Sequence, residues 1–192
     1  MLQFQTRTLL AALAVALLLI APGCKYFNKA SDDQTKEANK LQEEADQSAA
    51  KVEEAYNQAT QKEDAIKAEK KVKTRQQLND EETAIFDQAI ADAKAAADKY
   101  DQAAKLKVDE KYKQYLELRA QLMRKEGAHL AALKELPTAR KDTSVKGQRT
   151  LRDKQADIKT RSEKLKKEVD DLKAQADKMQ KENGDKFKAK SA

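Results

Sequence analysis

Few side chains in this sequence could take part in covalent or acid–base chemistry. Cys24 is its only cysteine and His129 its only histidine. A thiol can be acylated or act as a nucleophile, and an imidazole can act as a base near neutral pH. No His/Cys cluster surrounds either residue, so a zinc or copper site has no support. We expect His129 to be a partly buried or surface residue of a helix rather than a catalytic base.

The carboxylates are not arranged for catalysis either. The acidic pairs Glu53/Glu54, Glu81/Glu82 and Asp170/Asp171 are adjacent in the sequence and therefore point to different parts of a helix. Acid–base work needs one carboxylate in a pocket that raises its pKa, and no such pocket is indicated. We interpret these pairs as solvated faces. We expect no enzyme and no cofactor.

The sequence before Cys24 is typical of an exported protein. Arg7 is the only charged residue before an apolar run over residues 8–21, which Pro22 and Gly23 interrupt. A basic start, a short apolar stretch and small residues before a cut describe a secretory signal peptide. A spanning helix needs roughly 20 apolar residues, so a permanent membrane span is the weaker interpretation.

The tetrapeptide Ala21-Pro22-Gly23-Cys24 resembles the lipobox of bacterial lipoproteins. The resemblance implies that the signal, residues 1–23, is cut between Gly23 and Cys24. It also implies that Cys24 carries a diacylglycerol and further acyl chains such as palmitate, which bind a membrane. The alternative is an ordinary thiol, with ordinary signal peptidase cutting after Gly23. Because Cys24 is the only cysteine of an exported chain, lipidation explains it better.

The remaining chain has the composition of long helices. Over the whole sequence, charged residues make up 38% and aromatic residues 5%, with four Gly, two Pro and no Trp. After a tether at residues 24–30, small and apolar residues alternate at spacings of three and four, which predicts a helical seam. They are Ala38, Leu41, Ala45, Ser48, Val52, Ala55, Ala59 and Ile66.

Helical periodicity continues through residues 31–136. A cap formed by Asn79 and Glu82 would break the helix near residues 79–81, and a shift of face explains the pattern equally well. Tyr100, Tyr112 and Tyr115 follow the seam and are interpreted as core-edge residues rather than a binding cage. Pro137 should end the segment, with a loop at residues 137–147.

Residues 148–183 carry the clearest heptad pattern. One core position is apolar and the other is mixed, which predicts coiled-coil packing; the tail at 184–192 should fray. The apolar position holds Leu151, Ile158, Leu165, Leu172 and Met179, and the mixed one Gln155, Ser162, Val169, Ala176 and Asn183. The expected fold is all-α: an elongated antiparallel helical bundle or coiled coil of two or three long helices. Whether one chain folds back or two chains form a homo-oligomer is left open.

Charge differs between the two halves of the chain. Residues 24–103 contain 13 Lys/Arg against 18 Asp/Glu, and residues 104–192 contain 25 against 15. An acidic helix neutralised by a basic one is one explanation. The other is a polyanion site around the expected loop, formed by Arg140, Lys141, Lys146, Arg149 and Arg152. Nucleic acid is not the expected polyanion, because the chain is exported and no aromatic residues interleave with these cations.

These observations favour a lipid-anchored, non-enzymatic protein of the cell envelope. We expect a coiled-coil spacer or scaffold that binds another envelope protein or an anionic envelope polymer. Lys25 after the lipidated position resembles lipoproteins of the outer membrane facing the periplasm. The alternative function is a holdase-type periplasmic chaperone or transport accessory with helical arms. The resemblance indicates a cellular location and identifies no specific family.

Overall fold

The computed structural model describes residues 23–141 and 145–188, which form helices and short connections with no strand. The helices are α2 (Gly23–Ala68), α3 (Val72–Ala104), α4 (Glu110–Arg140), α5 (Val145–Asn183) and the 3-10 helix η1 (Gly184–Phe187). The all-α fold is therefore confirmed. The expected number of two or three long helices is wrong, because the described residues form four. The expected signal lies outside the described residues except for Gly23.

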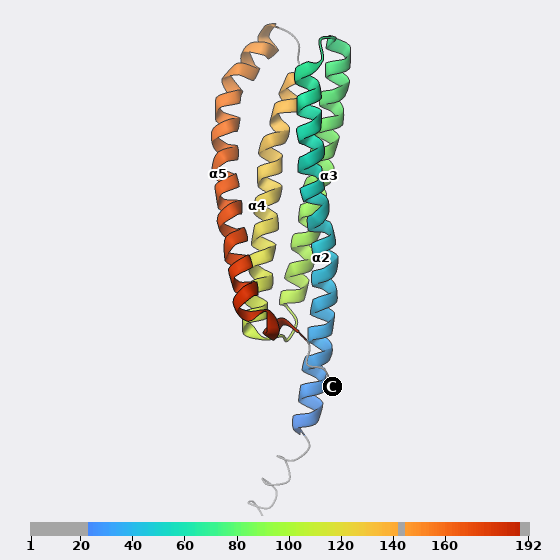
Figure 1. Ribbon diagram of the computed structural model, residues 1–192, viewed down its shortest axis with the longest axis vertical. Coiled ribbons are helices and arrows are strands. Elements are labelled where there is room, and N and C mark those ends of the chain that lie inside the picture. The colour runs from blue at the N-terminus through green and yellow to red at the C-terminus, as the bar shows by residue number, and fades with distance from the viewer. Residues whose placement is uncertain (1–22, 142–144, 189–192) are drawn as a thin grey trace, which may run out of the picture.

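Successive helices run in opposite directions and form an elongated bundle (Figure 1). Close packing joins α2 to α3, α3 to α4 and α4 to α5. The helices α2 and α5 are thus the two edges of the arrangement. The first turns of α2 project beyond the other helices at one end of the molecule (Figure 1). None of the described helices is long and apolar enough to cross a membrane.

The interface between α2 and α3 is built mainly from alanine. The predicted α2 seam is largely confirmed: its buried members are Ala38, Ala45, Val52, Ala55, Ala59 and Ile66, while Leu41 and Ser48 are half-buried. On α3 the buried alanines are Ala89, Ala93, Ala96, Ala97, Ala103 and Ala104. Small side chains let two helix axes approach closely, so an alanine seam can form a packed interface despite its small apolar area.

The first chain reversal comes earlier than the sequence suggests. It lies at residues 69–71, where Lys71 is extended and its N–H donates to Glu69 Oε1 at 2.7 Å. Asn79 and Glu82 are buried inside α3, so the expected cap does not form. The Asn79 amide instead donates to the carbonyl of Arg75, one turn back, at 2.8 Å. A side chain engaged in this way leaves the helix unbroken.

The second chain reversal was not predicted. The segment 31–136 also breaks at residues 105–109, and α4 starts after Asp109, whose carboxylate accepts from the Lys111 N–H at 2.8 Å. The reversal is held to α2 by the Lys107 N–H, which donates to Gln34 Oε1 at 2.6 Å. The expected segment 31–136 is therefore divided among three antiparallel helices, α2, α3 and α4.

Pro137 does not end its helix. It is fully buried in the last turn of α4, which continues to Arg140. Proline lacks an N–H and disfavours the helix interior, but a single proline in the last turn removes only one backbone hydrogen bond. Ion pairs from Arg140 to Glu63 and from Lys141 to Asp80 fix this end onto α2 and α3. The expected loop at 137–147 therefore shrinks to residues 141–144, of which 142–144 lie outside the described residues.

Two expectations at the chain ends are also corrected. The backbone of the expected tether, residues 24–30, is part of α2. At the other end, η1 occupies the start of the expected frayed tail, and Phe187 is buried between Tyr112 and Tyr115. Residues 189–192 lie outside the described residues. An aromatic side chain with two ring partners buries enough apolar area to order a short segment.

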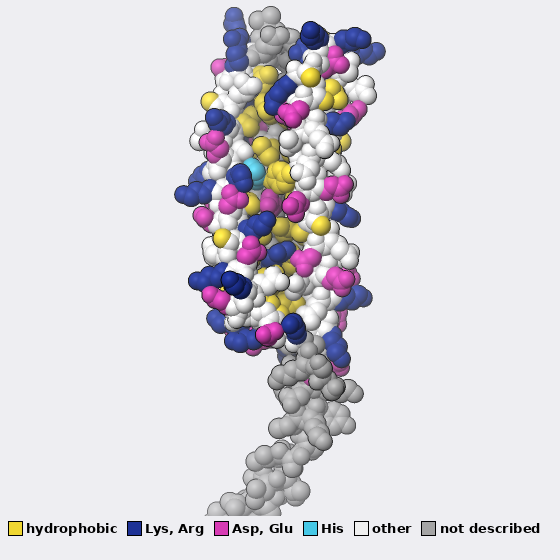
Figure 2. Space-filling view, in the orientation of Figure 1, with side chains coloured by type: hydrophobic (Ala, Val, Ile, Leu, Met, Phe, Trp, Pro, Cys, Tyr) yellow, Lys and Arg dark blue, Asp and Glu magenta, His cyan; other side chains and the backbone are white. Residues whose placement is uncertain are grey.

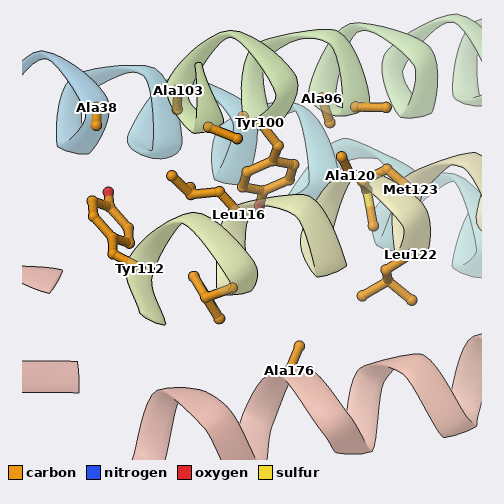
Figure 3. Packing of buried hydrophobic residues seen from close by; sticks show 14 of the residues in the cluster. Ala38, Ala96, Tyr100, Ala103, Tyr112, Leu116, Ala120, Leu122, Met123 and Ala176 are labelled. Atoms are coloured by element: carbon orange, nitrogen blue, oxygen red, sulfur yellow. The ribbon is translucent and has the colours of Figure 1, made fainter. Parts of the chain in front are cut away.

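The core runs along the bundle axis in two clusters. Tyr100, Tyr112 and Leu116 lie at the centre of the larger one, which Figure 3 shows between α3 and α4. Tyr100, Tyr112 and Tyr115 are fully buried, deeper than the expected core edge. The C-terminal stripe contributes Ile158, Val169 and Ala176 as buried residues. Its remaining apolar members are half-buried, and Gln155 is exposed.

Candidate binding groove

The two edge helices leave an open groove between them. Its walls are α2 and α5 and its floor is α4; we call it the α2–α5 groove. The main hollow has a volume of about 710 Å³. Figure 2 shows hydrophobic side chains following the long axis of this face between charged margins. The lining residues are Asp46, Ala49, Ala50, Val52, Glu53, Tyr56, Arg119, Leu122, Met123, Glu126, His129, Leu133, Ser162, Lys166, Val169, Asp170 and Lys173.

A second hollow of about 540 Å³ adjoins the first toward the C-terminal end of α5. The two share Asp46 and Ala50 as lining residues. The second hollow is lined by α2, the end of α5 and η1, and its wall on α2 is mostly polar, with Asn39, Gln42 and Gln47. The groove therefore extends over much of the opening between the edge helices.

A chain of four polar side chains crosses the floor of the main hollow. The Tyr56 hydroxyl donates to Glu126 Oε2 at 2.9 Å and lies 2.7 Å from His129 Nδ1. On the other side of the ring, His129 Nε2 lies 3.0 Å from Ser162 Oγ. Because the hydroxyl gives its one proton to Glu126, it accepts from Nδ1–H, and Nε2 accepts from Ser162. The chain thus connects α2, α4 and α5.

Burial shapes the titration of this chain. Burial lowers the pKa of His129, and nearby Lys166 lowers it further. Burial raises the pKa of Glu126, against the hydrogen bond from Tyr56. Burial, followed by the charge of Glu126, raises the pKa of the Tyr56 hydroxyl. The imidazole is only 6% exposed and therefore stays neutral at physiological pH.

The contact between Ser162 and His129 has the geometry of a nucleophile and its base. Catalysis of acyl transfer also needs donors for the developing oxyanion. Ser162 lies inside α5, where backbone N–H groups are already bonded along the helix. Within the described part of the groove wall, the backbone of α5 therefore offers no oxyanion hole. The arrangement is better suited to holding the three helices in register.

A second polar cluster lies at the margin of the same groove. Arg119 Nη2 donates to Asp46 Oδ1 at 2.8 Å and to the Tyr100 hydroxyl at 2.6 Å. The Tyr100 hydroxyl in turn donates to Asp46. This cluster joins α2, α3 and α4, and it satisfies the only polar atom of a fully buried tyrosine.

The residues expected to bind a polyanion do not form one cluster of free cations. Arg140 pairs with Glu63, its Nη2 donating to Oε1 at 2.9 Å, and Lys141 pairs with Asp80 at 2.8 Å. Arg149 and Arg152 lie on α5, where both are exposed and make no ion pair among the described residues. The side chain of Lys146 lies outside the description. Ion pairing with the acidic half of the chain therefore accounts for two of these cations.

The expected lipidation site lies at the first residues of α2. Gly23 and Cys24 begin that helix, and the side chains of Cys24 and Lys25 lie outside the described part of the structure. Among the described residues, no group of three or more His, Cys, Asp or Glu side chains could hold a metal ion.

Sequence reasoning placed His129 on a helix as a partly buried or surface residue, whereas the structure buries it, and its partners were not predicted. Nothing in the sequence pattern marked Tyr56 or Glu126 as a partner of His129. Ser162 could have been noticed, because it is a polar residue at a core position of the C-terminal heptad. A hydroxyl at such a position either faces solvent or needs a buried partner.

No family model, curated protein or solved structure matches this chain.

Proposed function

We propose that this protein is a lipid-anchored, non-enzymatic scaffold of the cell envelope that binds another envelope protein through the α2–α5 groove. The observation that carries the proposal is the open edge of the bundle. Four antiparallel helices can close by pairing the first with the last. Here that pairing is replaced by a groove whose lining mixes apolar side chains with polar and charged ones. A concave surface that combines apolar side chains with a few polar groups is typical of binding sites.

The position of the anchor is consistent with a spacer. Cys24 lies at the end of α2 that projects from the bundle (Figure 1). The 46 residues of α2 correspond to about 69 Å of helix. Lipid on Cys24 would hold one end at the membrane, and the connection between α4 and α5 would lie at the far end. Arg149 and Arg152 would then face an anionic polymer at a distance from the membrane.

Two finer features belong to the same proposal. One is a coiled-coil seam between the heptad stripe of α5 and α4, which the burial of Ile158, Val169 and Ala176 supports. The other is a location in the outer membrane facing the periplasm, which the lysine at position 25 supports. Binding of a partner in the groove does not require a second copy of the chain.

The apolar side chains that line part of the groove also favour a second function, that of a holdase-type chaperone or transport accessory. A scaffold binds one defined partner, whereas a holdase suppresses aggregation of unrelated unfolded proteins. Light scattering from thermally denatured client proteins, with and without the chain from residue 24 onward, separates the two. Suppression for several unrelated clients would favour the holdase.

The anchor is tested by mass spectrometry of the N-terminal peptide from cells expressing the full chain, combined with membrane fractionation. We expect a peptide that begins at Cys24 and carries diacylglycerol and acyl chains, recovered in the outer membrane. The Cys24→Ala variant should remain an unprocessed precursor. An unmodified Cys24 in the wild-type product, or recovery wholly in the inner membrane, would contradict the corresponding part of the proposal.

A further inference from the structure

The α2–α5 groove is bounded by three helical stripes. Each wall or floor helix presents residues at spacings of three and four: Val52 and Tyr56 on α2, and Ser162, Lys166 and Val169 on α5. On α4 the stripe runs over Arg119, Leu122, Met123, Glu126, His129 and Leu133. Ridges at these spacings are the surface on which another helix packs.

The length of the groove sets the size of its occupant. The lining residues run over ten residue steps on α2, from Asp46 to Tyr56, and over fourteen on α4, from Arg119 to Leu133. At 1.5 Å per step these spans correspond to about 15 to 21 Å. A helix of about 11 to 14 residues, three to four turns, would match the length of the main hollow.

Backbone hydrogen bonding favours a helix over an extended peptide. The walls and floor are helices, whose backbone groups are bonded internally. An extended peptide would leave most of its own N–H and C=O groups without partners, because the polar side chains of the floor are already bonded to one another. A helix satisfies these groups itself and presents only side chains to the floor.

The charges on the two walls favour an amphipathic occupant over an acyl chain. Glu53 on α2 and Lys173 on α5 are exposed, line the hollow and make no ion pair among the described residues. Lys166, also on α5, is paired with Asp170 at 3.1 Å. One wall therefore offers a free carboxylate and the other a free ammonium group, and an acyl chain would leave both unused.

We infer that the α2–α5 groove binds an amphipathic helix of a partner protein, of about 11 to 14 residues. Its apolar face would lie over Ala49, Ala50 and Leu133, apolar lining residues that keep part of their surface exposed. One flank would carry a cation opposite Glu53, and the other an anion opposite Lys173. This inference rests on the proposed function and deepens it by defining the chemistry of the partner.

The test uses the chain from residue 24 onward with Cys24→Ser. It retains every contact described above, since these lie within residues 32–188. The probe is a fluorescein-labelled helical peptide of about 14 residues, with Leu on one face, Lys on one flank and Glu on the other. Fluorescence anisotropy compares it with a scrambled peptide of the same composition. We expect saturable binding of the amphipathic peptide alone.

Two variants place the binding in the groove. Ala50 is exposed and lines both hollows, so Ala50→Trp should fill the groove and weaken binding about tenfold or more. Ala91 is an exposed alanine of α3 away from the groove, and Ala91→Trp is the matched control. Circular dichroism of both variants verifies that the bundle still folds. Equal affinities of the two folded variants would overturn the inference.

Charge reversal tests the recognition itself. Glu53→Lys makes both walls basic, so it should weaken binding of the mixed peptide several-fold. The same variant should bind a peptide with Glu on both flanks more tightly than the unaltered chain does. If the mixed peptide loses nothing and the acidic peptide gains nothing, the walls do not select charge and the inference is wrong.

Other occupants give different results. A fluorescent fatty acid that binds the groove and displaces the peptide would identify an acyl-chain site. A dimer in sedimentation equilibrium that Ala50→Trp dissociates would identify a second copy of the chain. Either result would overturn the inference. None of these assays depends on lipid at Cys24, so their outcome and that of the anchor experiment are independent.

Discussion

Glu82 is the buried carboxylate with the least favourable surroundings in the described bundle. It is 4% exposed, and its Oε2 has no hydrogen-bond partner. Arg140 lies 3.8 Å away but is already bonded to Glu63. Burial, followed by the charge of Glu63, raises the pKa of Glu82 to about 7. A protonated Glu82 is therefore the form that this end of the bundle accommodates.

This pKa predicts a specific dependence of stability on pH. The folded pKa lies above the value of 4.5 for an unperturbed carboxyl. The folded chain therefore binds more protons than the unfolded chain between pH 4.5 and 7, and stability falls as pH rises through this window. The loss should approach about 3 kcal/mol, at 1.36 kcal/mol per pH unit.

Glu82→Gln removes this titration while keeping the side-chain shape. We expect its free energy of unfolding, relative to the unaltered chain, to increase from pH 4.5 to 7 and to level off above. Urea denaturation at pH 4.5, 6 and 8 measures the difference. Parallel pH profiles of the two chains would show that folding does not raise the pKa of Glu82.

Some side chains could be assigned from the sequence and others could not. Adjacent carboxylates were interpreted as solvated, and Glu81 is paired with Lys62 at the surface at 2.5 Å. For Glu82 that interpretation is wrong, because the break expected beside it does not exist and α3 buries it. A local pattern shows which residues share a helix face, but the face that is covered depends on where the chain reverses.

At the scale of the element, periodicity predicted packing faces better than it predicted boundaries. Buried Ile158 and exposed Gln155 were both placed in the same seam. Heptad spacing assumes that both core positions face the same partner helix, whereas α5 packs mainly on α4 and leaves its other margin to the groove. The reversal at 105–109 depends on a single capping residue, Asp109, and on contacts with α2 that are remote in sequence.

The C-terminal element depends on one aromatic side chain. Phe187 stacks on Tyr112 and Tyr115 with ring centroids 5.0 and 4.9 Å apart. Phe187→Ala should destabilise the chain by about 2–4 kcal/mol, through lost apolar burial and a cavity between the two tyrosines. Lys186→Ala, at an exposed position of the same element, should cost less than about 0.5 kcal/mol.

Thermal and urea melts of both variants, in the Cys24→Ser chain from residue 24, provide the measurement. Equal, small losses would mean that η1 does not contribute to the stability of the fold. A large loss for Phe187→Ala alone would confirm that an ordered segment replaces the expected frayed tail.

At the scale of the whole molecule, the distribution of charge along the chain fits the antiparallel packing of its helices. The acidic N-terminal half pairs with the basic C-terminal half across helices, for example Asp46 with Arg119 at 2.8 Å and Asp80 with Lys141 at 2.8 Å. Such pairs contribute little stability each but favour one register. All-α, antiparallel architecture could be predicted from the sequence. The open edge could not be predicted, because no local sequence pattern indicates whether α2 and α5 pack against each other.

Whether α2 and α5 remain apart is decided by pulsed electron paramagnetic resonance between spin labels on cysteines introduced into the Cys24→Ser chain. The groove pair is Glu53→Cys with Lys173→Cys. Control pairs across packed interfaces are Gln58→Cys with Gln88→Cys on α2 and α3, and Arg124→Cys with Asp171→Cys on α4 and α5. We predict one narrow distribution for each pair, with the longest distance across the groove. A groove distance as short as the controls would show a closed bundle and contradict the binding site.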